Sequence, residues 1–300
     1  MGYPAIRTPP APLPAARDVL ELLKPITWFP PMWAFMCGVV SSGASLDGRW
    51  LFLIAGIALT GPLVCGTSQA VNDWFDRHVD AINEPGRPIP SGRIAGTWGL
   101  RIALIGTGLS LLVAWFVGPW VFAATVVGIV CAWAYSAPPF RFKASGWTGP
   151  AVVALTYEGL TWFTGASVMA GDLPDARILL ILLLYSLGAH GIMTLNDFKA
   201  VAGDDATGVR SLPVTLGVDR AAKFACFTMA AAQAAVIALL VRWDMTVPAT
   251  IVAILLSLQL VMMPKLVAQP ALRAPWYAAR GVTLYVLGML AAALGLGGYL

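Results

Sequence analysis

The feature that most constrains this chain is its series of long apolar segments that carry almost no charge. Segments such as residues 98–117 run for about 20 residues, the length that a helix needs to cross a hydrocarbon layer roughly 30 Å thick. Backbone groups in lipid must pair within their own segment or in a closed barrel, so open sheets are excluded. Of the 300 residues, 58% are apolar and only 11% are charged. We therefore predict an all-α, polytopic membrane protein.

Charged and turn-forming residues separate the apolar segments into nine predicted transmembrane helices. These are 26–44, 51–71, 98–117, 119–136, 149–170, 177–195, 221–241, 246–263 and 280–299. With a cytoplasmic N-terminus, sixteen of the nineteen Lys and Arg residues fall on the cytoplasmic side, as the positive-inside rule requires. The basic balance then reflects membrane topology, and we expect no nucleic-acid partner. Residues 1–25 are predicted to form a cytoplasmic tail and an interfacial helix, and residues 26–300 a single transmembrane domain.

Two acid-rich segments, residues 72–97 and 196–220, follow the second and sixth predicted spans and share one order of residues. Each opens on an Asn-Asp pair, and the two pairs lie 124 residues apart. An Arg stands 15 residues after the first Asn and 14 residues after the second. By the parity of the spans, both segments face the cytoplasm. We predict two similar halves whose acidic loops meet at one membrane surface, an arrangement common among membrane proteins built from repeats.

The spacing of the acids predicts a metal site. Asn72, Asp76 and Asp80 are four residues apart and form one oxygen-rich face on a helix. Asp197 and Asp204 are seven apart and are expected to share a face in the second loop. Carboxylate and amide oxygens suit Mg²⁺, which keeps positions open for substrate phosphates. We predict that all five residues are catalytic and bind Mg²⁺ as the cofactor. Solvated surface salt bridges are the alternative for either loop alone.

Basic residues predicted for the same surface complete a diphosphate site. These are Arg87, Arg141, Lys143, Lys199 and Arg210. Guanidinium and ammonium groups neutralise phosphate oxygens, and the organic part of such a substrate would lie in the apolar bundle. A polyisoprenyl diphosphate meets both demands.

Two further residues are predicted to bind substrate. Tyr135 ends the fourth span beside the basic residues. Glu158 is an acid at membrane depth, which is costly and indicates function. For Glu158, a hydrogen bond to the substrate and a protonated carboxyl packed against a neighbouring helix stay equal alternatives.

The sequence resembles the UbiA superfamily of intramembrane prenyltransferases. "NDWFDRHVD" (72–80) fits its NDxxDxxxD pattern, and "YSAPPFRFK" (135–143) is similar to its YSxPPxRxK segment. "NDWFDRHVDAINEPGRPIPSG" and "TLNDFKAVAGDDATGVRSLPVTLG" are similar to the branch of chlorophyll and bacteriochlorophyll synthases. Many members carry another Asp three or four residues after the first acid of the second loop, where this chain has Ala200 and Val201. The second metal face is therefore expected to pair Asp197 with Asp204 or Asp205.

The resemblance implies a UbiA-like bundle and a Mg²⁺-dependent prenyltransferase. It implies transfer of a geranylgeranyl or phytyl group from its diphosphate to the propionate of a chlorophyllide or bacteriochlorophyllide, with release of diphosphate. A propionate is ionised near neutral pH, so this acceptor needs no strong general base. We expect a multi-pass protein of the bacterial inner or intracytoplasmic membrane, and the sequence identifies no protein partner. A related prenyltransferase with an aromatic or haem acceptor, and a non-enzymatic pigment-binding or transport protein, are the alternatives.

Overall fold

The computed structural model describes residues 12–300, and within that range the chain forms helices and connecting segments, with one isolated backbone bridge between Ser145 and Arg210. The all-α prediction is therefore confirmed for these residues. Most of the predicted N-terminal tail falls on residues 1–11, outside the described range. The α-helices are α1 (Ala16–Leu23), α2 (Phe29–Ser41), α3 (Trp50–Ala58), α4 (Gly66–Asn83), α5 (Trp98–Val117), α6 (Pro119–Ser136), α7 (Thr148–Ala154), α8 (Thr161–Ala170), α9 (Ala176–Asp197), α10 (Val201–Thr207), α11 (Leu212–Leu216), α12 (Val218–Arg242), α13 (Thr246–Ala268) and α14 (Pro270–Leu296).

Four short helices of other types complete the chain. Two are 3₁₀-helices, η1 (Pro25–Thr27) and η3 (Phe142–Ala144). Two are π-helices, η2 (Leu59–Cys65) and η4 (Leu155–Leu160), and each is inserted between two α-helices that continue one another. Such π-helical turns inside a helix are frequent at functional sites. Both π-helices border the cavity described below.

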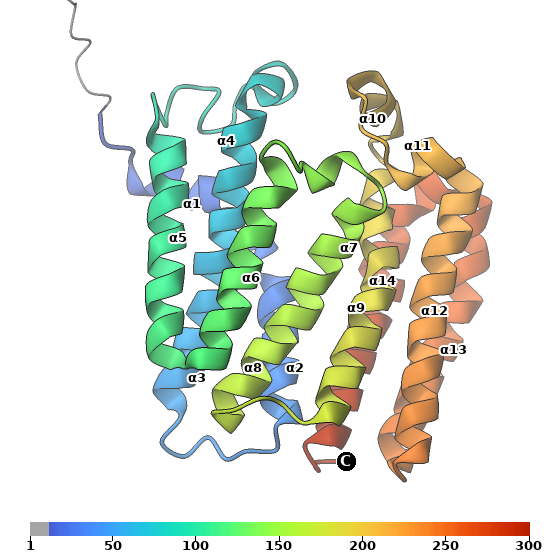
Figure 1. Cartoon of the computed structure of the whole chain (residues 1–300). Helices are drawn as coiled ribbons and strands as arrows, with labels where there is room; N and C mark the ends of the chain where they lie inside the picture. The colour runs from blue at the N-terminus through green and yellow to red at the C-terminus, as the bar shows by residue number, and fades with distance from the viewer. Residues whose placement is uncertain (1–11) are drawn as a thin grey trace, which may run out of the picture.

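Seven helical segments within residues 12–300 are long and apolar enough to cross a membrane. They are the continuous run Trp50–Asn83, which joins α3, η2 and α4, together with α5, α6, α9, α12, α13 and α14. The two other predicted spans coincide with α2, a shorter apolar helix, and with the run of α7, η4 and α8. In Figure 1 the long helices pack side by side into one bundle. The chain is a multi-pass membrane protein.

Two segments predicted as loops are largely helical. Residues 72–83 continue α4, because the first helix-breaking residues come only at Pro85 and Gly86. The predicted loop 264–279 is filled by α13 and α14, which are separated only at Gln269. Pro270 occupies the first turn of α14, where its missing N–H leaves no hydrogen bond unmade.

Glycines bring α2 and α8 into backbone contact. A Cβ atom at Gly38 would lie 2.0 Å from the carbonyl oxygen of Trp162, and a Cβ atom at Gly165 would lie 2.0 Å from that of Phe35. Small residues allow this close approach between helices in lipid, where dispersion contacts rather than water exclusion hold helices together. The contact fixes α8, and with it the adjoining π-helix η4, at the side of the cavity.

Candidate active site

A cavity of about 720 Å³ lies between helices from the two halves of the chain. Its polar end is lined by eight of the predicted site residues: Asn72, Asp76, Asp80, Tyr135, Arg141, Lys143, Asp197 and Asp204. Further along the same helices the lining is apolar and includes Leu59, Val64, Ala124 and Leu160. The structure therefore joins a charged end to an apolar interior within one space.

The two acidic segments lie at the same end of the bundle, where Figure 1 shows the end of α4 and the helix α10, and both contribute side chains to the polar end of the cavity. The Tyr135 hydroxyl lies close enough to Asp76 and to Asp197 to interact electrostatically with both. Asp197 is also close to Asp204. The prediction that these two acids share one helix face is wrong, because α9 ends at Asp197 and Asp204 belongs to α10. Both nevertheless line the cavity.

Backbone hydrogen bonds fasten the second acidic segment to the basic loop between α6 and α7. The Arg210 N–H donates to the Ala144 carbonyl (2.9 Å), and the Gly146 N–H donates to the Arg210 carbonyl (2.7 Å). Gly146 is required there, because a Cβ atom would lie 2.2 Å from the backbone nitrogen of Leu212. The segment that carries Asp204 is thus held against the loop that carries Lys143.

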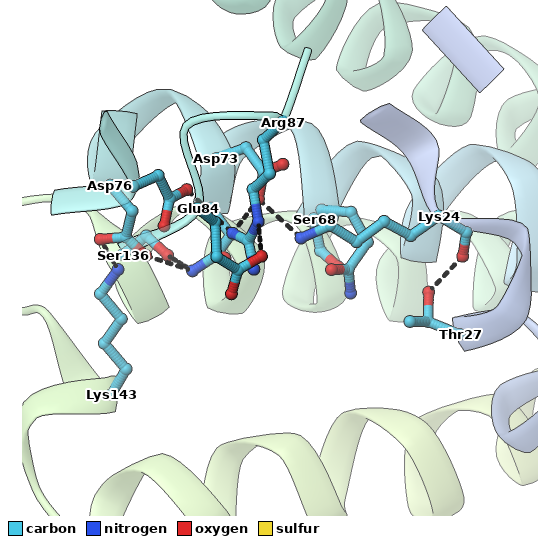
Figure 2. A network of polar contacts seen from close by, with 12 residues as sticks. Lys24, Thr27, Ser68, Asp73, Asp76, Glu84, Arg87, Ser136 and Lys143 are labelled. Carbon is cyan, nitrogen blue, oxygen red and sulfur yellow. Dashed lines mark hydrogen bonds and ion pairs between the residues drawn. The ribbon is translucent and has the colours of Figure 1, made fainter. Parts of the chain in front are cut away.

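The first acidic segment is held by side chains that pair with one another (Figure 2). The Lys143 ammonium contacts the Asp76 carboxylate directly. The Asn72 amide donates to the same carboxylate (3.0 Å) and to the Ser136 hydroxyl (3.1 Å). Burial lowers the pKa of the Lys143 ammonium, while the hydrogen bond to Asp76 raises it. The amide and the ammonium therefore fix the direction of the Asp76 carboxylate.

Asp73, directly after Asn72, lies behind this face and does not line the cavity. Its side chain is 1% exposed, and it pairs with Lys24 at 2.6 Å and with Arg87 at 3.4 Å (Figure 2). Arg87 also pairs with Asp80 at 2.8 Å and with Glu84 at 2.5 Å. Sequence reasoning assigned no role to Asp73 or Lys24. The seven-residue spacing of Asp73 and Asp80, which places both on one side of α4, is the signal that could have found this network.

Four predicted substrate-binding residues are not part of the cavity lining. They are Arg87, Glu158, Lys199 and Arg210. The Arg87 guanidinium is directed to three carboxylates, and the Lys199 and Arg210 side chains are exposed. Arg210 contributes its backbone to the bridge described above.

Glu158 is buried within η4, on the side of the helix away from the cavity. Its side chain lies near Cys37 of α2 and Tyr285 of α14, and its Oε2 atom has no hydrogen-bond partner in the described part of the chain. The preceding residue, Tyr157, lines the cavity instead. In this π-helical turn the Tyr157 side chain faces the cavity, while the Glu158 side chain lies toward α2 and α14.

The oxygen donors at the polar end are spread across the cavity. Within residues 12–300, no three His, Cys, Asp or Glu side chains gather into a preformed ion cage. Mg²⁺ is commonly held by one or two carboxylates together with water and substrate phosphate, whereas tighter cages suit other ions. The five predicted ligands, four carboxylates and one amide, all line one cavity and therefore fit Mg²⁺ that is shared with a diphosphate.

These features define a class of protein, an intramembrane enzyme that handles a substrate with an anionic head and an apolar tail. The sequence matches the UbiA prenyltransferase family over residues 28–287, and the chain belongs to that family.

Curated relatives narrow the comparison further. The chain is 58% identical over 289 residues to the bacteriochlorophyll synthase 33 kDa chain of Cereibacter sphaeroides, with 96% of each chain covered. It is 52% identical over 290 residues to the protein of the same name from Rhodobacter capsulatus, with 96% of this chain and 95% of the relative covered.

A solved structure shares the fold. It is a UbiA homolog from Archaeoglobus fulgidus bound to DMAPP and Mg²⁺, with a TM-score of 0.71 and 19% sequence identity. The match covers 91% of this chain and 99% of the homolog. The predicted UbiA-like fold is thereby confirmed.

Proposed function

We propose that this chain esterifies the propionate of a chlorophyllide or bacteriochlorophyllide with a geranylgeranyl or phytyl group taken from its diphosphate. The observation that carries the proposal is the single cavity whose charged end adjoins an apolar interior. The two relatives, both bacteriochlorophyll synthase chains, support a bacteriochlorophyll-type product. The alternative acceptors, aromatic or haem, and the non-enzymatic reading receive no such support.

The charged end would bind the diphosphate. Arg141 and Lys143 line this end of the cavity. A guanidinium can bind phosphate through two parallel hydrogen bonds, and an ammonium acts as a compact positive charge. Asp76, Asp80, Asp197 and Asp204, with Asn72, would hold Mg²⁺, as the Mg²⁺-bound homolog suggests for this fold. Bound there, Mg²⁺ neutralises charge on the diphosphate and makes it a better leaving group.

The apolar interior would take the prenyl chain and exclude water from its reactive carbon. Leu59, Val64 and Leu160 line this part of the cavity. As the bond between carbon 1 and the diphosphate weakens, negative charge grows on the departing oxygens, and Lys143 and Arg141, which line this end of the cavity, would stabilise it. Since the acceptor is a carboxylate, no proton has to be removed from it.

The proposal includes a location and an orientation. Sixteen of the nineteen Lys and Arg residues fall on the side of the acidic segments if the N-terminus is cytoplasmic. We place the charged end at the cytoplasmic face of the bacterial inner or intracytoplasmic membrane, where the diphosphate head of an amphiphilic donor meets water.

Purified protein offered both macrocyclic acids in competition, with geranylgeranyl and phytyl diphosphate in separate reactions, tests the proposal. Mass spectrometry of the extracted pigment should show a prenyl ester that forms only with Mg²⁺ present. A parallel reaction with homogentisate and hydroxybenzoate serves as the control. Product with the phenolic acids and none with either macrocycle would refute the proposal.

A further inference from the structure

The polar face of α4 extends into the cavity beyond the acids. Cys65, Ser68 and Gln69 precede Asn72 on the helical run, and all line the cavity. Gln69 lies three residues before Asn72, which is about 4.5 Å deeper along the helix axis. An amide at this depth stands apart from the charged end and at the border of the apolar interior.

The Tyr157 side chain, which comes from η4, contacts Gln69, and both residues line the cavity. The Gln69 amide Nε2–H donates to the Tyr157 hydroxyl at 3.3 Å. The Cys65 sulfur lies 3.3 Å from the same hydroxyl and 3.4 Å from the Thr27 carbonyl oxygen. Four elements, η1, η2, α4 and η4, thus bring polar groups to one point of the cavity wall.

The donors at this point are incompletely used. The Cys65 thiol donates to the Thr27 carbonyl, which leaves the Tyr157 O–H with the Cys65 sulfur, a weak acceptor. Besides Tyr157, the Gln69 amide has the Cys65 sulfur as its neighbour, again a weak acceptor, and Gln69 lines the cavity. A hydroxyl and an amide N–H therefore stand ready for an anionic oxygen, which accepts far better than a thiol.

We propose that Gln69 and Tyr157 form the subsite that holds the carboxylate of the acceptor, an inference that rests on the proposed function. Carbon 1 of the donor is bonded directly to the diphosphate, so it lies just below the charged end, at the depth of this pair. One carboxylate oxygen would accept from Tyr157 and Gln69 while the other faces carbon 1.

The resulting step balances without a base. A lone pair of the acceptor oxygen forms the new carbon–oxygen bond, and the bond between carbon 1 and the diphosphate breaks with its electrons on the leaving diphosphate. Neutral donors suit this task, since a Lys or Arg would pair with the carboxylate and weaken it as a nucleophile. The same two groups discriminate against acceptors whose carboxyl is blocked.

Three variants test the subsite in the full-length protein. Tyr157→Phe and Gln69→Leu each remove one donor, and we expect the KM for the macrocyclic acid to rise about tenfold, as for the loss of one hydrogen bond to a charged group. The KM for the prenyl diphosphate should stay within about twofold. Thr156→Ala is the matched control, because Thr156 lines the same cavity but its hydroxyl donates to its own helix, to the Val152 carbonyl.

A binding measurement gives a readout that does not depend on turnover. Quenching of pigment fluorescence in the presence of an unreactive donor analogue compares the macrocyclic acid with its propionate methyl ester. Wild type should prefer the acid, and Gln69→Glu, which keeps the side-chain shape but repels a carboxylate, should lose that preference while still binding the ester. An unchanged preference for the acid in Gln69→Glu and Tyr157→Phe would overturn the subsite. Failure of the wild type to esterify any macrocyclic acid would instead overturn the proposed function.

Discussion

The two acidic segments are organised by different forces. In the first, three successive carboxylates have cationic partners: Asp73 with Lys24, Asp76 with Lys143, and Asp80 with Arg87. In the second, the ion pairs found within residues 12–300 include none to Asp197, and the segment is placed by backbone hydrogen bonds between residues 144–146 and Arg210. The first half of the site is thus oriented by charge, and the second by backbone.

This difference assigns separate tasks to the two halves. A carboxylate that already pairs with Lys or Arg has a fixed direction, and it attracts a further cation less because its charge is partly neutralised. A carboxylate near a second carboxylate, as Asp197 is near Asp204, gains most from an added cation. We infer that the first half sets the geometry of the site. The carboxylates of the second half would contribute most of the attraction for a metal cation.

The largest effect is expected at Asp76, where both halves and the basic loop come together. Asp76→Asn keeps the shape of the side chain but removes the charge that faces Lys143, and we predict a fall in kcat/KM of about a thousandfold, within the range for a group that stabilises transition-state charge. Steady-state kinetics over a range of Mg²⁺ concentrations measure it. Asp205→Asn is the control, since Asp205 is exposed and not part of the cavity lining. Equal activity of the two variants would contradict the assignment of Asp76.

The bundle and much of its polar end follow from the sequence alone. Hydropathy located the helices, and four-residue spacing placed Asn72, Asp76 and Asp80 on one cavity-facing side. The direction of Arg87 could not be predicted, because it depends on Asp73, whose burial comes from the packing of the segment around Lys24 against α4. Spacing rules assume 3.6 residues per turn. They fail within π-helices and across helix ends.

Two positions show that failure. Glu158 lies in η4, where the altered helix directs its neighbour Tyr157 to the cavity. Asp197 and Asp204 were expected on one helix face, but the chain turns between α9 and α10. The turn between α9 and α10 brings both side chains to the same cavity, and helical periodicity cannot predict the direction of such a turn.

A second prediction compares how one substitution in each half changes the stability of the protein toward unfolding. Asp73→Asn leaves Lys24 without its ion-pair partner and removes one of the three carboxylates around Arg87, which keeps Asp80 and Glu84. We expect the free energy of unfolding to fall by about 3 kcal/mol, as for breaking a buried ion pair. Asp197→Asn removes repulsion toward Asp204 and should leave the unfolding temperature unchanged or higher. Thermal unfolding of both variants in the same detergent provides the measurement. The reverse order of stabilities would show that charge does not organise the first half.

The smallest of these effects is expected where backbone alone positions the second half. Gly146→Ala places a Cβ atom against the backbone of Ser211 and Leu212, at 2.6 Å and 2.2 Å, so the bridge to Arg210 must open. We expect the KM for the prenyl diphosphate to rise about tenfold, because carboxylates displaced by even an ångström lose much of their effect. Gly203→Ala is the matched control in the same segment, since nothing lies within 4 Å of its Cβ position. The two backbone hydrogen bonds that are lost should lower the unfolding temperature, but by less than Asp73→Asn does, because the ion pairs of the first half do not involve Gly146. A large loss of stability with an unchanged KM would show that the bridge serves folding and not the site.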